Sequence, residues 1–335
     1  MNIIITGGCG FIGSALIKFL IKKTNHKILN IDKLTYASNK NYLTTNTKNY
    51  SFFKIDICNE KKIKNLFYKF QPNLIIHLAA ETHVDNSIKD SKRFMKSNIF
   101  GTYNLLEISK EYIEKNKYPK DFKFYYISTD EVYGDLGNKN KLFNENSNYN
   151  PSSPYSASKA SADHLVRSWG RTYKLPILIS NCSNNYGPNQ NSEKLIPLVI
   201  NRAINGLQIP VYGNGKQIRD WLYVDDHVDA IYKIATKGKI GDSYNIGGNN
   251  QIKNIDVVKT ICDILNYSKI RKPNNINSFF DLITYVSDRK GHDYKYGIDI
   301  NKINKKLKWK PKENFETGIK KTIKWYLNNI YFKYL

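Results

Sequence analysis

Short apolar runs alternate with amphipathic segments along the first half of the chain. The first run, residues 3–5, is a β-branched triplet typical of a buried strand, and the amphipathic segment 15–23 follows it. Further strand-like runs occupy residues 27–31, 50–55, 72–80, 122–127 and 176–180, and helical patterns occupy residues 60–70, 98–110 and 154–168. Strands that alternate with helices predict an α/β fold with a doubly wound parallel sheet.

The pattern changes near residue 189. Helical patterns then cover residues 194–203, 256–265 and 316–327, with strand-like runs at residues 208–212 and 242–247, the second of which we expect to return to the first sheet. We therefore predict a smaller α/β substrate-binding domain in the C-terminal half. The first domain is expected to comprise residues 1–186 and 220–250, and the second to comprise residues 187–219 and 251–335.

The turn after the first strand is rich in glycine. Gly7, Gly10 and Gly13 stand in TGGCGFIG between strand and helix, as in a Rossmann-type dinucleotide-binding turn. Glycine fits there because the turn needs unusual backbone angles and because a side chain blocks the pyrophosphate. Such turns also close ordinary strand–helix units, but here Asp32 follows where a ribose-binding acid is expected. An acid repels a 2′-phosphate, so we expect NAD rather than NADP, a preference that the adjacent Lys33 weakens slightly.

Two further strand ends are predicted at the same crevice. Asp56 follows the run at residues 50–55, where it either contacts the adenine side of a cofactor or caps the helix at residues 60–70, two compatible readings. The run at residues 72–80 ends in Ala79 and Ala80, and such small residues let a ligand lie across the sheet.

Two adjacent acids, Asp130 and Glu131, directly follow the strand-like run at residues 122–127 and the pair Ser128-Thr129. One alternative is a surface turn with a helix cap. We favour a functional pair, because the carboxyl end of a core strand lies over the cofactor crevice in this fold. Neighbouring carboxylates push each other's pKa values apart, which suits one acid and one base.

Tyr155 and Lys159 open a predicted helix and share one face of it, because they are four residues apart. A tyrosine that must lose a proton near neutrality needs a cation beside it, and Lys159 can supply that charge and also bond the nicotinamide ribose. An aromatic–cation pair on an exposed helix is the alternative. Together with the glycine turn and the strand end at Thr129, the functional interpretation is the stronger one.

Lysine dominates the charge balance. Lys and Arg number 52 against 29 acids, which gives a net charge of +23 and suggests either a nucleic-acid partner or plain overuse of lysine. We favour overuse, because the lysines are scattered through every segment and no nucleic-acid motif is present. A basic surface still attracts an anionic substrate such as a nucleotide sugar.

Cysteines and histidines restrict the chemistry further. The four cysteines form no CxxC pair, which is typical of reduced thiols in a cytosol. We expect no leader and no membrane span, and therefore a soluble cytoplasmic protein. No histidine stands at metal-ligand spacing, so no metal is expected, and His292 near Arg289 is the best functional candidate among the histidines.

These residues resemble the extended short-chain dehydrogenase/reductase family, through TGGCGFIG and the Tyr155-x-x-x-Lys159 pair. Within it the match is close to the dTDP-glucose 4,6-dehydratase group and covers nearly the whole chain, with Thr129-Asp130-Glu131 as its most specific part. The matching stretches are DKLTYA from Asp32, HLAAETHVDNS from His77, STDEVYGD from Ser128, PSSPYSASKASADHLVR from Pro151, NCSNNYGP from Asn181, EKLIPLVI from Glu193, QIRDWLYVDDH from Gln217, YNIGG from Tyr244 and DRKGHD from Asp288.

The resemblance implies an NAD-dependent dehydration of a nucleotide-linked glucose in deoxysugar biosynthesis. It assigns removal of the sugar O4 proton to Tyr155, removal of the C5 proton to Glu131 and protonation of the departing C6 hydroxyl to Asp130. Thr129 is implied to polarise O4, and Lys159 to hold the ribose and lower the pKa of Tyr155. It also implies a homodimer.

The resemblance implies contacts as well. NAD contacts fall at Gly7, Gly10, Phe11, Ile12, Gly13, Asp32, Lys33, Leu34, Thr35, Asp56, Ile57, Leu78, Ala79, Ala80, Glu81, Thr82, Ser97, Tyr155, Lys159 and Asn185. Substrate contacts fall at Thr82, Thr129, Asn184, Lys194, Leu195, Pro210, Val211, Tyr212, Arg219, Asn254, Asp288, Arg289, Lys290, Gly291 and His292. Arg219 and Arg289 suit a diphosphate, because guanidinium binds phosphate in a bidentate way.

The chain departs from the group's pattern on the substrate side. Residues 189–192 replace an aromatic-bearing stretch, Lys290 stands where proline is common, and Asn86 stands where arginine is common. These departures leave the nucleobase open. The alternatives are therefore a UDP-glucose dehydratase or another nucleotide-sugar epimerase or decarboxylase, and, from a different class, an inactive NAD-binding or nucleic-acid-binding protein.

Overall fold

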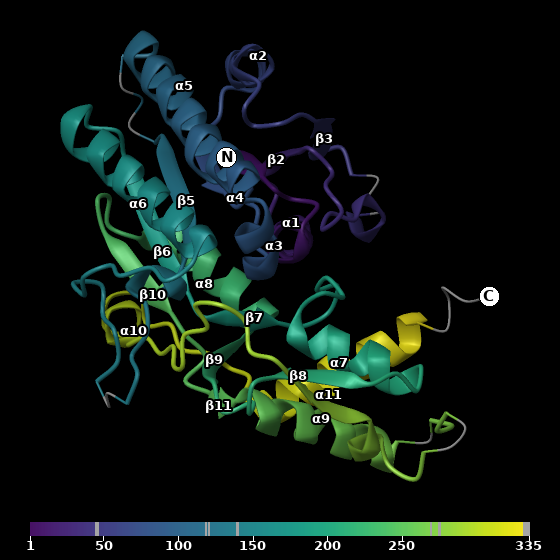
Figure 1. Ribbon diagram of the computed structural model, residues 1–335. Helices are drawn as coiled ribbons and strands as arrows, with labels where there is room; N and C mark the ends of the chain where they lie inside the picture. The colour runs from purple at the N-terminus through teal and green to yellow at the C-terminus, as the bar shows by residue number, and fades with distance from the viewer. Residues whose placement is uncertain are drawn as a thin grey trace.

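The computed structural model describes residues 1–43, 47–117, 119, 121–138, 141–268, 270–273 and 276–330. These residues form two parts, which Figure 1 shows one above the other. The upper part is built on a large parallel sheet, and the lower part consists of helices and two small sheets. The second half of the chain crosses between the two parts repeatedly.

Seven parallel strands form the large sheet, in the order β10-β6-β5-β4-β1-β2-β3. The strand order reverses direction beside β1, and open α/β sheets bind ligands at the carboxyl ends of the strands at such a point. The strands are β1 (Asn2–Thr6), β2 (Lys27–Asp32), β3 (Tyr50–Lys54), β4 (Leu74–His77), β5 (Lys123–Thr129), β6 (Ile177–Cys182) and β10 (Ser243–Ile246).

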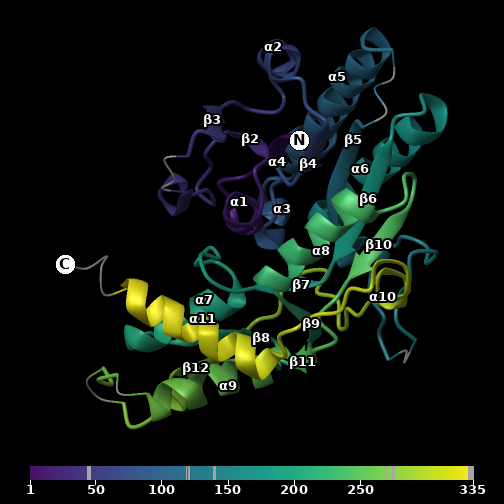
Figure 2. The same ribbon diagram turned by 180° about the vertical axis from the view of Figure 1, so that it is seen from behind.

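Helices cover both faces of this sheet, because both sets of alternating strand residues are apolar. Ile3 and Ile5 of β1 belong to one core cluster, and Ile4 between them belongs to the other. The first cluster includes residues of α1 (Phe11–Lys23) and α8 (Val224–Lys237), and the second includes residues of α2 (Glu60–Phe70), α5 (Gly101–Lys115) and α6 (Pro154–Thr172). Helices α5 and α6 run side by side in both ribbon views (Figures 1 and 2).

The lower part has its own apolar core, formed by three helices and the small sheets. Figure 2 shows α11 in yellow, beside α7 and near α9. The elements are α7 (Leu195–Ile204), α9 (Asn254–Tyr267), α11 (Phe315–Ile330), the three-stranded sheet of β7 (Asn184–Tyr186), β9 (Ile218–Tyr223) and β11 (Gln251–Lys253), and the pair of β8 (Ile209–Tyr212) and β12 (Ile283–Val286).

Short helical elements connect the larger ones and shape the edge of the sheet. The turn η3 (Asp130–Tyr133) follows β5 directly, so that Thr129 ends the strand and the two acids begin the turn. The others are η1 (Lys40–Leu43), α3 (Val84–Lys89), α4 (Ser91–Phe94), the π-helical η2 (Met95–Phe100), η4 (Phe279–Leu282) and α10 (Asn301–Leu307).

The predicted fold class is confirmed, and two local expectations are corrected. Asp56 does not cap α2: Asn59 is the N-cap and accepts from the N–H of Lys62, whereas Asp56 Oδ1 accepts from the N–H of Cys58. Helix α8 is absent from our predicted elements. Its first turn carries two acids, which are typical of a helix start, but our predicted first domain includes residues 220–250 without a helix there.

Strand β10 does return to the large sheet, where it pairs with β6. The domain boundaries stay a prediction. Packing places Ile300, Ile303 and Trp309 in the core cluster that includes α8, so part of the chain that we assigned to the second domain packs against the first.

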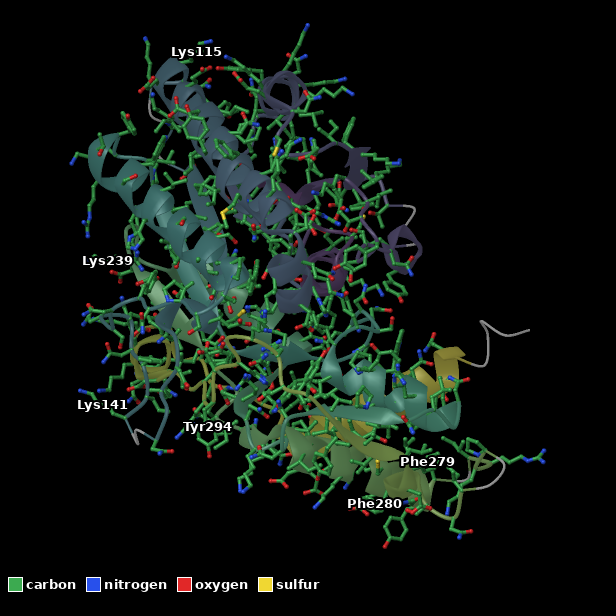
Figure 3. The ribbon with its side chains drawn as sticks, in the orientation of Figure 1. Lys115, Lys141, Lys239, Phe279, Phe280 and Tyr294 are labelled. Atoms are coloured by element: carbon green, nitrogen blue, oxygen red, sulfur yellow. The ribbon has the colours of Figure 1, made fainter. Side chains whose placement is uncertain are left out.

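The charged surface is spread over the molecule. Figure 3 shows Lys115 at the top of the structure and Lys239 and Lys141 at different heights along its left side, and all three are exposed. Among the described residues, no helix is long and apolar enough to cross a bilayer. The same part of the chain contains no group of three or more His, Cys, Asp or Glu residues that could hold a metal ion.

Candidate active site

A cleft opens at the carboxyl ends of the strands around β1 and extends to the loop before α7. It brings together most of the residues predicted from the sequence. These are Gly7, Gly10, Phe11, Ile12, Gly13, Asp32, Lys33, Thr35, Ile57, Leu78, Ala79, Ala80, Thr82, Ser97, Thr129, Asp130, Glu131, Tyr155, Lys159, Asn184, Asn185 and Lys194. Three predicted cofactor contacts, Leu34, Asp56 and Glu81, lie outside this lining.

The glycine turn is held tightly against the sheet. Gly7 has a positive φ of 74°, and a Cβ placed on it would lie 2.7 Å from the Cα of Ala79, which follows the end of β4. At Gly13 a Cβ would lie 2.3 Å from the carbonyl oxygen of Gly7. Gly10 is the N-cap of α1 and supplies no side-chain hydrogen bond, so the first N–H groups of the helix remain for a ligand. A helix N-terminus of this kind suits a pyrophosphate.

Asp32 organises the loop that follows β2. Its Oδ2 accepts from the N–H of Cys9 at 3.0 Å, and its Oδ1 accepts from the N–H of Leu34 at 2.8 Å and from the Ser38 hydroxyl at 3.0 Å. A carboxylate has about four acceptor sites, so these bonds leave capacity for one more donor. Leu34 therefore contributes through its backbone, which adopts a left-handed φ of 58°.

Glu81 acts on the cofactor side through other residues. Its side chain is buried and pairs with Lys33 and Arg93, both at 3.0 Å. Lys33 also donates to the Ser97 hydroxyl at 3.1 Å. This arrangement compensates the positive charge of Lys33, which was the one feature that weakened the preference for NAD.

Asp130 and Glu131 differ in their surroundings. Asp130 is 2 % exposed, whereas Glu131 is half-buried. Burial raises the pKa of Asp130 well above its usual value, and the charge of Glu131 raises it further. Burial also raises the pKa of Glu131, but Arg289 and Arg219 oppose that rise. Asp130 is therefore the better proton donor and Glu131 the better base.

Tyr155 begins α6, where Ser153 and Ser156 form a capping box. Its N–H donates to the Ser87 hydroxyl at 3.2 Å, and its ring packs edge-on against Phe94. Burial raises the pKa of Tyr155 well above its usual value, Glu131 adds to the rise, and a hydrogen bond from Thr129 opposes it. The predicted lowering of this pKa is therefore wrong for the protein alone.

Burial, and not Lys159, dominates the pKa of Tyr155, and Lys159 is occupied within the fold. Its Nζ donates to the carbonyl of Ile127 at 2.7 Å and lies 4.1 Å from the centre of the Tyr126 ring. The side chain is buried, and burial lowers the pKa of Lys159 to about 8. The lysine is thus placed at the cleft but close to losing its charge at moderately alkaline pH.

Thr129 connects the two acids with the tyrosine. Its hydroxyl accepts from the N–H of Glu131 and donates to Asp130 Oδ1, both at 3.3 Å. Asn181 on β6 supports the same strand end, because its Nδ2 donates to the Thr129 carbonyl at 3.1 Å. The predicted catalytic residues therefore meet at one end of β5 and α6.

The remaining predicted substrate residues lie outside the cleft lining. Arg219 is 4 % exposed and donates to the carbonyls of Ile218, Tyr294 and Asp293, so backbone oxygens occupy much of its guanidinium. The other residues in this set are Leu195, Pro210, Val211, Tyr212, Asn254, Asp288, Arg289, Lys290, Gly291 and His292.

Contacts across the cleft mouth bring part of this set toward the upper part. Tyr212 donates to Asp85 at 3.4 Å, and Arg289 lies 4.0 Å from the same carboxylate. Lys194 donates to the carbonyl of Thr82 at 3.0 Å. His292, in turn, shares a 2.6 Å hydrogen bond with Asp288.

Buried polar atoms without a partner among the described residues show that the site fits a polar ligand. Asn184 Oδ1, Ser183 Oγ and Gln190 Oε1 line the cleft in this state. Among the described residues of the lower part, Arg289 Nε and Asn254 Oδ1 are likewise buried without a hydrogen-bond partner. Because buried polar groups are normally paired, these atoms are available to a cofactor and a phosphorylated sugar.

Some lining residues are missing from our prediction, although several adjoin predicted ones. Ser38 lies in the loop after β2, Cys182 ends β6, and Ser128 directly precedes Thr129. The sequence predicts a loop, a strand end and a functional pair at these three places. The ends of the predicted strands therefore indicate these residues as well. The remaining ones are Ile31, Ala37, Ile55, Ile127, Ser183, Gln190, Asn191 and Glu193.

Comparisons with known proteins agree with this geometry. A dTDP-glucose 4,6-dehydratase of Haemophilus influenzae is 53% identical over 333 residues, which cover 98% of each chain. A solved dTDP-glucose 4,6-dehydratase of Bacillus anthracis in complex with NAD is 40% identical with a TM-score of 0.86, and the match covers 98% of this chain and 97% of that one. One from Streptomyces venezuelae with NAD and TYD bound is 33% identical with a TM-score of 0.90, covering 99% and 98%.

The family model described as GDP-mannose 4,6 dehydratase matches residues 4–322, which includes every residue of the cleft. The chain therefore belongs to the GDP-mannose 4,6-dehydratase family, in company with the dTDP-glucose 4,6-dehydratases that are about half identical to it.

Proposed function

We propose that the chain is an NAD-dependent dTDP-glucose 4,6-dehydratase, which forms dTDP-4-keto-6-deoxyglucose and water. The observation that carries this proposal is the meeting of Asp130, Glu131 and Tyr155 at one end of the cleft. Relatives with that name match the chain over nearly its full length.

The upper part of the cleft fits NAD. The open N-terminus of α1 suits the pyrophosphate, and Asp32 retains one acceptor site for a ribose hydroxyl. When bound, NAD accepts a hydride from C4 of the sugar and returns it at C6, so that it is regenerated. All other steps depend on proton transfers by residues of this chain.

Tyr155 removes the O4 proton as C4 is oxidised, and the Thr129 hydroxyl orients O4. Because burial raises the pKa of Tyr155, positive charge must be present beside the phenol when it acts. Lys159 is the cation that α6 supplies, four residues along the same face.

Glu131 then removes the C5 proton, which the C4 ketone has made acidic. Asp130, kept protonated by burial, gives its proton to the departing C6 hydroxyl, so that the C6–O bond breaks and water leaves. After the hydride reaches C6, C5 takes a proton back. The two neighbouring carboxyl groups thus perform opposite tasks because their environments differ.

Mass spectrometry of the reaction tests the proposal. The purified protein is incubated separately with dTDP-glucose, UDP-glucose and GDP-mannose without added reductant. We expect a product lighter by one water from dTDP-glucose, formed faster than from the other two. Failure to lose water from any of the three contradicts the dehydratase assignment, and a faster reaction of UDP-glucose changes the nucleobase only.

A second candidate, an epimerase, comes from a structural neighbour. UDP-glucose 4-epimerase of Thermotoga maritima is 29% identical with a TM-score of 0.86, and the match covers 98% of this chain. The acid pair after Thr129 favours dehydration, because epimerisation at C4 removes no oxygen from C6. The same incubations separate the two, since an epimer has the mass of its substrate.

We also propose that the protein works as a homodimer. Helices α5 and α6 lie side by side, and three aromatic side chains are exposed in or directly beside them: Phe100 before α5, Tyr103 within α5 and Tyr173 after α6. Such apolar side chains favour association with a second copy. Sedimentation of the purified protein tests this, with a dimer mass expected and a monomer mass contradicting it.

A further inference from the structure

Helix α6 carries a row of four polar residues that extends from the cleft into the protein. Tyr155, Lys159, Asp163 and Arg167 are spaced four apart and therefore lie along one helical face. Tyr155 and Lys159 line the cleft, whereas Asp163 is 0 % exposed and lies beneath it. The proposed mechanism uses the first two and leaves the buried acid without a role.

Asp163 is tied to the catalytic strand end. Its Oδ2 accepts from the Tyr149 hydroxyl at 2.7 Å and from Asn181 Nδ2 at 3.3 Å. The same Asn181 Nδ2 donates to the carbonyl of Thr129 at 3.1 Å. Arg167 reaches this group through Tyr149, whose hydroxyl accepts from its Nη2 at 3.3 Å. The acid is thus fixed by neutral donors, with one cation on either side of it along α6.

Lys159 has neutral hydrogen-bond and ring partners. It donates to the Ile127 carbonyl and lies over the Tyr126 ring. A buried ammonium group needs a nearby negative charge to remain protonated. Asp163, one helical turn away, is the carboxyl group whose charge most supports protonation of Lys159.

Other titratable groups face Lys159 from each neighbouring element. They are Tyr126 on β5, Cys182 on β6, His77 on β4 and Tyr155 on α6 itself. Burial lowers the pKa of His77 to about 3 and raises that of Cys182 to about 12, so both are neutral near pH 7. Burial also raises the pKa of Asp163, while Tyr149, Lys159 and Arg167 oppose that rise.

We propose that Asp163 is a positioning residue that keeps Lys159 in its ammonium form at the cleft, where Lys159 supports Tyr155 and the cofactor ribose. The inference rests on the proposed function of Tyr155 and Lys159. Asp163 itself touches neither substrate nor cofactor in this arrangement. Asp163 contributes to the protonation of Lys159 through its negative charge. This effect is separate from the hydrogen bonds that the same carboxylate accepts.

The sign of the expected effect follows from the charges. Burial lowers the pKa of Lys159 to about 8 while Asp163 opposes the decrease. Asn at position 163 keeps the shape but removes the charge, so the pKa of Lys159 falls further. The ammonium is then lost at lower pH, and the alkaline limb of the kcat profile moves toward lower pH.

The experiment measures kcat and KM from pH 6 to pH 9.5 for the wild type, Asp163→Asn and Asp163→Ser. We expect both variants to move the alkaline limb down by about one pH unit or more, which is a tenfold loss relative to wild type on that limb, with KM little changed. Asp226→Asn is the matched control. Asp226 is also a buried helical acid, but it accepts from the N–H groups of Lys312 and Glu313, away from the cleft lining.

Two results overturn the proposal: limbs that coincide with wild type in both variants, or an equal shift in Asp226→Asn. The pH dependence of NAD affinity, followed by quenching of protein fluorescence, gives a second readout. As pH rises, we expect Asp163→Asn to lose NAD affinity at a lower pH than wild type does. Affinity profiles that coincide in the two proteins contradict the proposal. If the wild type forms no dehydrated product, the proposed function fails, and the NAD measurement still decides the role of Asp163.

Discussion

Replacement of Asp32 by alanine removes the acceptor that holds the glycine turn and the following loop together. Three donors lose their partner: the N–H groups of Cys9 and Leu34 and the hydroxyl of Ser38. A hydrogen bond to a charged group contributes about 1.5–3 kcal/mol. The Cys9 bond is buried, whereas water can reach the other two donors. We therefore expect a loss near the lower end of the summed range, about 4.5 kcal/mol of unfolding free energy.

The effect on NAD has two sources. The fourth acceptor site of Asp32 is lost to the ribose, at a cost of about 1.5–3 kcal/mol, and the loop is no longer ordered before binding. An affinity loss of roughly 30-fold or more follows, because each 1.4 kcal/mol is about tenfold. Equilibrium dialysis with NAD and urea unfolding measure the two quantities.

Ser38→Ala is the graded control, because it removes one of the three bonds and leaves the carboxylate in place. We expect it to lose about 1.5 kcal/mol of stability and only a few-fold of NAD affinity. If Asp32→Ala binds NAD within twofold of wild type, the carboxylate does not contact the ribose and our account of the cofactor side is wrong.

Three further predictions address the fold, the acid and the substrate. Gly7 has a φ of 74°, and a Cβ on it would lie 2.7 Å from Ala79 Cα, so Gly7→Ala should lose about 2 kcal/mol or more of unfolding free energy in urea and bind NAD weakly. Gly137 has a φ of 54° but no neighbour within 4 Å, so the control Gly137→Ala should keep NAD binding. Equal losses of NAD binding in the two variants contradict this prediction. Burial raises the pKa of Asp130, so the wild type loses stability as pH rises toward that pKa. We expect Asp130→Asn to gain stability relative to wild type as pH rises from about 4 to about 7. A difference in unfolding free energy between the two proteins that does not change with pH, measured in urea, refutes this. Arg289→Ala should raise KM for dTDP-glucose about tenfold with less effect on kcat, while the exposed Arg171→Ala should not; an unchanged KM in Arg289→Ala argues against a diphosphate contact.

The sequence was sufficient for the upper part of the site, for a physical reason. Buried parallel strands are continuous apolar runs, and their carboxyl ends meet at one edge, so glycines or acids that directly follow such runs come together. Gly7, Asp32 and Asp130 satisfy this rule and line the cleft, whereas Asp56 also follows such a run and lies outside the lining.

The lower part was harder to predict because long-range contacts determine it. The resemblance implies that Arg219 contacts the substrate diphosphate, but the fold uses much of its guanidinium for backbone carbonyls from residues more than 70 positions away. Nothing local to a sequence reports such contacts. The pKa of Tyr155 escapes prediction for a related reason, because burial by elements distant in the chain raises it.

The central claim is that Glu131 removes the C5 proton and Asp130 protonates the leaving hydroxyl. The most direct test is deuterium incorporation at C5 when dTDP-glucose is incubated in heavy water with wild type, Glu131→Gln and Asp130→Asn. We predict deuterium at C5 with wild type, none with Glu131→Gln, and retained exchange with slowed loss of water in Asp130→Asn. Undiminished exchange in Glu131→Gln contradicts the account, because the base must then be a different residue.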